Sequence, residues 1–177
     1  RTLPENIRVE LEMPRLPLVI SADPSRLQQA LMNMAINARD AMPQGGILRL
    51  SVAPTHLLPG QQPSLANPRA NANHDGWLCI GIGDSGTGIA ADVLPRIFDP
   101  FFTTKAPGMG TGLGLAQVHG IVHQLHGFIQ VESQVGAGTL FTIYLPLVDR
   151  PVPVMDEKLA PPPRGQGETI LLVEDGA

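Results

Sequence analysis

The chain has 177 residues, of which 43% are hydrophobic and 16% are charged, so it can bury one core and still leave residues for linkers. Its formal net charge of −4 argues against nucleic acid as a partner, because a protein that binds the phosphate backbone carries a clustered basic face. Its apolar runs are too short to span a bilayer, and one cysteine excludes an internal disulfide. Because the sequence starts at Arg1 with no Met and ends two residues past an acidic pair, we expect an excised piece of a longer protein. No signal-peptide pattern opens it, and we expect it to be located in the cytoplasm.

Two strands and a helix are expected in the N-terminal part. Residues 7–13, "IRVELEM", alternate apolar and polar side chains, and residues 16–21, "LPLVIS", follow after a proline. Both segments are typical of strands. A helix is predicted over 24–42, because Asp23 can serve as its N-cap and Pro24 suits the first helical position.

The predicted helix has a broad apolar face with a narrow polar stripe beside it. Asn33, Asn37 and Asp40 form the stripe, since residues three and four apart lie on one side of a helix. The stripe borders the core instead of opposing it, so these polar side chains are candidates for a binding site at the edge of the core. The apolar face comprises Leu27, Ala30, Leu31, Met34, Ala38 and Ala41.

The rest of the chain predicts further strands and a second helix. In chain order we expect a strand at 45–53, a polar loop at 54–75, a strand at 77–83, short helical pieces and a mobile stretch within 89–109, a helix within 110–127 stopped by Gly127 as its C-cap, and strands at 128–133 and 139–146. This order favours an α+β fold, a two-layer sandwich in which helices cover one face of a mixed sheet.

The segment "GIGDSG" at 81–86 matches the G-x-G-x-x-G fingerprint of dinucleotide-binding loops. The carboxylate of Asp84 argues against a phosphate loop, because a fixed anion there would repel the pyrophosphate. An aspartate at the end of a buried strand can instead accept a hydrogen bond from an exocyclic amine, while Gly86 and Gly88 let a flat ring approach the backbone. The segment is therefore interpreted as a base pocket.

A second glycine-rich segment, "GMGTGLGLA", precedes the predicted helix of 110–127 and exposes backbone N–H groups at its start. Such a segment suits the binding of phosphates. Nucleotide phosphates are usually bridged by a metal ion, and Asn37 offers a neutral amide oxygen as a Mg²⁺ ligand.

Five segments together resemble the successive sequence boxes of the ATP-binding domain of bacterial sensor histidine kinases. The resemblance covers residues 7–147 and extends to a superfamily with gyrase, mismatch-repair ATPases and a heat-shock chaperone, whose shared fold is the Bergerat-type ATP-binding fold. The segments are "NMAINARDAMPQGG", "DSGTGI", "FDPFFTTK", "GTGLGL" and "GAGTLFTIYLP".

This resemblance implies roles for individual residues. Asp84 would hold the adenine amine, Thr139 would assist through a water, and Asn37 would hold Mg²⁺. Lys105 would reach the terminal phosphates from a lid, and Arg39 is a second candidate cation because Asp40 stands where many members have lysine. The complete set of candidate ATP-binding residues is Asn33, Asn37, Arg39, Asp40, Asp84, Gly86, Gly88, Lys105, Gly110, Thr111, Gly112, Leu113, Gly114, Leu115 and Thr139.

Asn33 favours a kinase over a hydrolase. The ATPases of the superfamily carry a glutamate at this position, one helical turn before the metal-binding asparagine, and it activates the attacking water. An asparagine cannot act as that base. The resemblance thus implies transfer of the γ-phosphoryl of Mg-ATP to a histidine, while a superfamily ATPase and a nucleotide-binding regulatory module remain alternatives.

The histidines of this chain do not match the acceptor motif of the family, in which an acidic residue follows the histidine. The resemblance therefore implies an acceptor on a separate dimerisation domain, and we expect this chain not to phosphorylate itself. His119, His123 and His126 recur at helical spacing, so a metal site and a solvated helix flank both remain open.

The C-terminal part changes in composition. Residues 148–167 are proline-rich and predict a linker, and residues 168–177, "ETILLVEDGA", resemble the Mg²⁺-binding start of a receiver domain. Residues 1–147 would then be the catalytic domain of a hybrid kinase, which would be a homodimer at full length, whereas this piece would be a monomer. The parent could be a membrane-bound sensor with this part in the cytoplasm.

Overall fold

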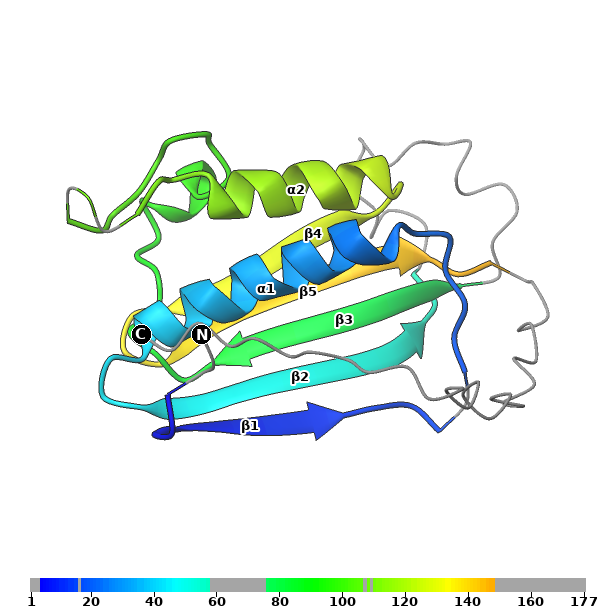
Figure 1. The fold of residues 1–177 in the computed structure, drawn as a ribbon, viewed down its shortest axis with the longest axis horizontal. Helices are drawn as coiled ribbons and strands as arrows, with labels where there is room; N and C mark the ends of the chain where they lie inside the picture. Colours follow the sequence, from blue (N-terminus) through cyan, green and yellow to red (C-terminus); the bar gives the residue numbers. More distant parts are fainter. Residues whose placement is uncertain (1–3, 16, 58–75, 107, 109, 149–177) are drawn as a thin grey trace, which may run out of the picture.

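Five strands and two α-helices make up the fold in the computed structural model, which describes residues 4–15, 17–57, 76–106, 108 and 110–148. The strands form one sheet in the order β1-β2-β3-β5-β4, and both helices lie on the same face (Figure 1). β1 runs parallel to β2 and the other neighbours are antiparallel, so the sheet is mixed. The predicted α+β sandwich is confirmed. The strands are β1 (Ile7–Glu12), β2 (Gly46–Thr55), β3 (Trp77–Asp84), β4 (Phe128–Gln134) and β5 (Gly138–Pro146).

The first helix, α1 (Pro24–Ala41), begins and ends close to the predicted bounds. The Asp23 carboxylate accepts a hydrogen bond from the Ser25 N–H at 2.8 Å, as expected for an N-cap. The second helix, α2 (Gly114–Gln124), packs beside α1, and the Arg26 guanidinium donates to Gln124 between them. A short 3₁₀ helix, η2 (Leu94–Arg96), is the regular helical piece described between β3 and α2.

The strand predicted for 16–21 is wrong. The described residues of this segment form one isolated bridge, from Ile20 to Leu147, and the N–H of Val148 donates to Val19 O at 2.9 Å. Pro17 has no N–H to give to a ladder, and this explains why an apolar pattern here does not become a strand. The loop predicted from residue 54 also begins later, because β2 continues to Thr55. Most of the rest of that loop lies outside the described residues.

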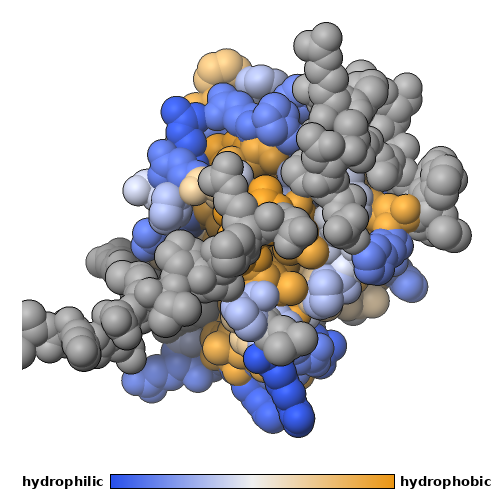
Figure 2. All heavy atoms as spheres, turned by 90° about the vertical axis from the view of Figure 1, so that its right-hand side faces the viewer, coloured by the Kyte–Doolittle hydropathy of each residue, from blue (hydrophilic) through white to orange (hydrophobic). Residues whose placement is uncertain are grey.

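The core lies between the two helices and the covered face of the sheet. Seen from the end of the molecule where α1 begins, hydrophobic side chains gather in the middle and hydrophilic ones at the border (Figure 2). Burial of each large apolar side chain contributes roughly 1.5–3 kcal/mol relative to exposure. The most buried large side chains are Met34, Leu48, Ile82, Val118, Val122, Ile143 and Leu145.

The sequence predicted Gly127 as the C-cap of α2, but this prediction is wrong. The helix ends at Gln124, and His126 adopts the left-handed conformation with a φ of 59°. The N–H of His126 donates to His123 O at 3.0 Å and the N–H of Gly127 donates to Val122 O at 2.9 Å, which together form a Schellman motif. Gly127 is required for space instead, because a Cβ at this position would overlap the carbonyl oxygen of Tyr144.

Gly127→Ala is therefore expected to lower the free energy of unfolding by about 1–3 kcal/mol, because the turn after α2 and the backbone of β5 must move apart. Gly120→Ala is the matched control. Gly120 lies inside α2, and a Cβ at this position would meet open space, so alanine there should stabilise the chain by up to about 1 kcal/mol. Urea unfolding of both variants measures the two effects, and a Gly127→Ala variant as stable as the original chain would contradict this explanation.

Candidate functional site

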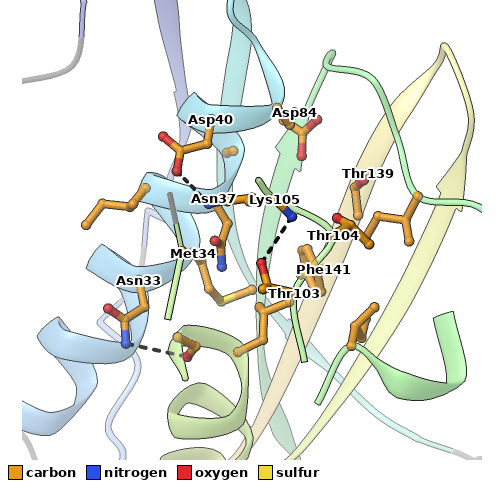
Figure 3. Close-up of a pocket in the computed structure, with 18 of the residues that line it drawn as sticks. Asn33, Met34, Asn37, Asp40, Asp84, Thr103, Thr104, Lys105, Thr139 and Phe141 are labelled. Carbon is orange, nitrogen blue, oxygen red and sulfur yellow. Dashed lines mark hydrogen bonds and ion pairs between the residues drawn. The ribbon is translucent and has the colours of Figure 1, made fainter. Parts of the chain in front are cut away.

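A cavity of about 570 Å³ opens between one flank of α1, the end of the sheet and the loop before α2. Its volume lies within the roughly 300–1,000 Å³ typical of small-molecule sites. Figure 3 shows Asn33, Asn37 and Asp40 along one side of α1, where Asn33 is joined to the start of α2 and Asp40 is joined to Lys105 of the loop. The candidate residues that line the cavity are Asn33, Asn37, Arg39, Asp40, Asp84, Gly88, Lys105, Gly110, Thr111, Gly112, Gly114, Leu115 and Thr139.

The other two candidates, Gly86 and Leu113, do not line the cavity. Gly86 donates its N–H to the Asp84 carboxylate at 2.9 Å, and a Cβ on Gly86 would crowd the carbonyl of Ala41 at the end of α1. Leu113 occupies the N-cap position of α2, and its N–H donates to the Thr111 hydroxyl at 3.3 Å. Both residues therefore support the walls of the cavity.

A polar row crosses the end of the sheet on its covered face. Asp84 of β3 pairs with Thr139 of β5, and Thr139 pairs with Ser133 of β4. The next row inward is apolar and includes Ile82 and Phe141, which also line the cavity. A flat, partly polar ligand can thus lie on an apolar floor with hydrogen-bonding groups at one end.

Burial raises the pKa of Asp84 above its ordinary value, although hydrogen bonds from the backbone of Gly86 and Thr139 act in the opposite direction. The carboxylate has thus lost part of its hydration without gaining a cation from the described part of the chain. Such a group favours a hydrogen-bond donor as its ligand, because a donor replaces the lost hydration.

Asp40 sits in a different electrostatic environment. Burial acts to raise the pKa of Asp40, but hydrogen bonds and charges from Lys105 and Arg39 outweigh it and hold the pKa below the ordinary value. The Lys105 ammonium donates to one carboxylate oxygen at 2.6 Å, and the Arg39 guanidinium donates to the other at 2.7 Å. One carboxylate thus holds two cations at the rim of the cavity.

The two asparagines of α1 play different parts in this geometry. The Asn33 amide donates to Gln117 Oε1 at 3.1 Å and to Gly114 O at 3.5 Å, so it joins α1 to α2. Asn37 lies one turn later, and its amide faces Gly114 at the first residue of α2. Asn37 therefore stands beside the N-terminus of a helix, where the backbone carries partial positive charge.

The loop before α2 is closed at its base by two residues. The N–H of Phe101 donates to Gly112 O at 3.0 Å, and Phe101 has an unusual φ of 67°. A Cβ on Gly112 would overlap the backbone of Phe101, so the close approach requires glycine. The intervening segment carries Thr103, Thr104 and Lys105 to the cavity.

Several residues of the site were missed by the sequence interpretation. Thr103 and Thr104 line the cavity, and Ser133 contacts Thr139 at 2.9 Å. A serine in an alternating strand gives no signal of its own, and the threonines fell in a segment whose conformation the sequence did not determine. The apolar residues of the cavity were predictable only as core.

A family model described as "Histidine kinase-, DNA gyrase B-, and HSP90-like ATPase" matches residues 22–149. The chain belongs to this family. The sensor kinase CckA of Brucella abortus (strain 2308) is 40% identical over 183 residues, which cover 99% of this chain and 19% of that protein. The sensor histidine kinase ZraS of Escherichia coli (strain K12) is 44% identical over 128 residues, which cover 72% of this chain and 23% of that protein. The chain spans about a fifth of the length of these relatives.

Solved structures agree with this assignment. Full-length ShkA in complex with AMPPNP matches with a TM-score of 0.61 at 26% identity, over 84% of this chain and 27% of that one. The nucleotide-free catalytic domain of the histidine kinase ThkA matches with a TM-score of 0.60 at 27% identity, over 80% of this chain and 79% of that one. The described domain is accordingly a histidine kinase ATP-binding catalytic domain.

The histidines do not form one helical stripe, because His126 lies beyond the end of α2. The His119 ring packs against Phe98 with 5.2 Å between ring centroids. Among the residues described, no group of three or more histidine, cysteine, aspartate or glutamate side chains could hold a metal ion. None of the described helices is long and apolar enough to cross a membrane.

The raised pKa of Asp84 predicts a pH-dependent effect of Asp84→Asn. The folded chain binds this proton more tightly than the unfolded chain, so ionisation of Asp84 weakens the fold as the pH rises from the ordinary pKa of 3.8 through the higher folded value. The asparagine variant avoids this loss. Its unfolding free energy relative to the original chain should therefore increase from about pH 4 to about pH 7 in urea titrations. A difference that stays constant with pH would contradict the assignment.

Asp40→Asn should loosen the segment of residues 101–106, because the Lys105 ammonium loses its charged partner. The pair is about one-third exposed on each side, so its contribution is at most about 1 kcal/mol and the Lys105 amide should exchange hydrogen up to about fivefold faster. Asp99→Asn is the control, since it removes only the exposed pair with Arg96 at 3.8 Å. Equal exchange in both variants would show that Asp40 does not anchor this segment.

Proposed function

We propose that this domain binds Mg-ATP and presents its γ-phosphoryl group to a histidine on a dimerisation domain outside this chain. One observation carries the proposal: Asp84, Asn37 and the glycine-rich start of α2 surround a single cavity in a domain of the histidine kinase family. The three parts offer a recognition group for a base, a ligand for a metal and a cradle for phosphates.

The end of the sheet suits adenine. Asp84 would accept a hydrogen bond from the exocyclic amine, and Thr139 would contribute beside it, directly or through a water. Gly88 has a φ of 69°, and a Cβ there would overlap the Gln134 carbonyl, so the turn lies close against β4. Met34 and Phe141 provide apolar surface for the faces of the ring.

The start of α2 suits the phosphates. The free N–H groups of its first turn and the helix dipole favour an anion at this point. Gly110, Gly112 and Gly114 line the cavity here, and a Cβ on Gly114 would lie 3.8 Å from Nδ2 of Asn37. Side chains at these positions would therefore fill the space that the phosphates need.

The residues around Asn37 also fit a magnesium ion. The amide of Asn37 can offer a neutral oxygen, which is a ligand that Mg²⁺ accepts together with phosphate oxygens and waters. When bound, the ion would neutralise charge on the phosphates. Asn37 would hold the ion, while Lys105 and Arg39 would provide further positive charge at the same rim, with Asp40 keeping both cations in place until nucleotide binds.

Hydrolysis is disfavoured by Asn33. Its amide has no basic group with which to activate water, and it is already engaged with Gly114 and Gln117. A kinase needs instead to position the γ-phosphoryl group, neutralise its charge and exclude water. The site therefore supports transfer to an external acceptor better than the release of free phosphate.

The remaining parts of the longer protein belong to the same proposal. Residues 1–147 would form the catalytic domain, 148–167 a linker and 168–177 the start of a receiver domain; most of the last two ranges lies outside the described residues. The histidine-bearing dimerisation domain and the receiver would be the partners of this domain, in a homodimeric hybrid kinase. This domain alone would be a monomer in the cytoplasm.

Mixing the chain with Mg-ATP labelled on the γ-phosphate tests the proposed reaction. The chain alone should gain no acid-labile label and release phosphate slowly, whereas addition of the histidine-bearing domain of the same protein should transfer label to that domain. Asn37→Ala should reduce the transfer by at least about 100-fold, because the metal loses its protein ligand. Steady phosphate release by the chain alone would favour an ATPase, and binding without transfer would favour a regulatory module.

A further inference from the structure

Ser133 lies at the end of the polar row and connects three parts of the base pocket. Its hydroxyl oxygen lies 2.8 Å from the N–H of Ile89, 3.0 Å from the carbonyl of Gly138 and 2.9 Å from the hydroxyl of Thr139. Ile89 follows the glycine turn of residues 84–88, and Gly138 begins β5. The serine thus ties β4 to the turn and to the neighbouring strand.

The directions of these hydrogen bonds follow from counting protons. A backbone N–H can only donate and a carbonyl can only accept, so Ser133 accepts from Ile89 and gives its single proton to Gly138. The remaining lone pair of Ser133 can then only accept, and Thr139 must donate to it. All the hydrogen-bonding capacity of the serine hydroxyl is used.

This arrangement fixes what Thr139 offers to a ligand. Thr139 is 5% exposed, and its one hydroxyl proton points to Ser133, so only lone pairs remain towards the cavity. The ionised carboxylate of Asp84 stands directly opposite Thr139 in the sheet and also has only acceptors. The polar end of the cavity therefore presents hydrogen-bond acceptors from both residues.

We propose that Ser133 is a positioning residue that sets the base specificity of this site. By taking the proton of Thr139, it makes the pocket favour a purine with an amino group at position 6 and disfavour one with a carbonyl oxygen there. The inference rests on the nucleotide-binding function proposed above and adds to it a residue that does not touch the base. A purine carbonyl would meet unmatched acceptors, which weakens its binding.

Binding of ATP and of inosine triphosphate to the same chain tests the inference, because the two ligands differ in the base at position 6 and N1. The original chain should prefer ATP, and Ser133→Ala should reduce this preference by about tenfold, since Thr139 becomes free to donate to the inosine carbonyl. Ser133→Thr keeps the hydroxyl, so this variant should keep the preference of the original chain for ATP over inosine triphosphate. Ser85→Ala is the matched control, because it removes a hydroxyl that accepts the Ile47 N–H at 2.9 Å without touching Thr139.

The effect should also depend on Thr139. In a Thr139→Val background, Ser133→Ala should leave the ratio of the two affinities unchanged, because no hydroxyl proton remains to be redirected. Ser133→Cys keeps the size of the side chain and weakens its hydrogen bonds, so it should lower the ratio of the ATP affinity to the inosine triphosphate affinity. This variant provides the test if Ser133→Ala does not fold. An equal loss of both affinities in Ser133→Ala, or in Ser133→Cys, overturns the inference and leaves nucleotide binding intact. Failure of the original chain to bind ATP would instead overturn the proposed function.

Discussion

The pairing of β3 with β5 is the constraint on which the site depends. Its register sets Asp84 opposite Thr139, and the next pairing sets Thr139 opposite Ser133, all on the face covered by the helices. A slip of one residue would turn β3 over, placing Asp84 on the open face and removing Ile82 from the core. The apolar rows inward of the polar row therefore determine where Asp84, Thr139 and Ser133 lie, so core packing and the polar end of the cavity share one register.

The helix α1 serves the core and the site at once. Its buried face holds Met34 and Ala38 against the sheet, and the adjoining flank brings Asn37 and Asp40 to the cavity. Two features of the site are costly for folding: the Asp84 carboxylate, which has lost hydration, and the glycines that stand in place of side chains. The large apolar interface beneath them supplies the stability that allows such groups to remain in place.

The sequence predicted the layers, the two helices and most of the residues that line the cavity, because each rests on a local pattern. Asp23 and Pro24 define the start of α1, and the glycines before α2 mark the loop that lines the cavity. It did not predict features that depend on distant residues. The pair of Lys105 with Asp40 joins positions 65 residues apart, and the bonds of Ser133 depend on strand register. It misjudged residues 16–21 because a proline removes the donor that an apolar strand would need.

A crystal structure of this domain with Mg²⁺ and a non-hydrolysable ATP analogue tests the central claim most directly. The account predicts the adenine amine within hydrogen-bond distance of the Asp84 carboxylate, the Thr139 hydroxyl still directed to Ser133, and the metal ion on the amide oxygen of Asn37. A base bound away from the end of β3, or a metal ion held without Asn37, would contradict it.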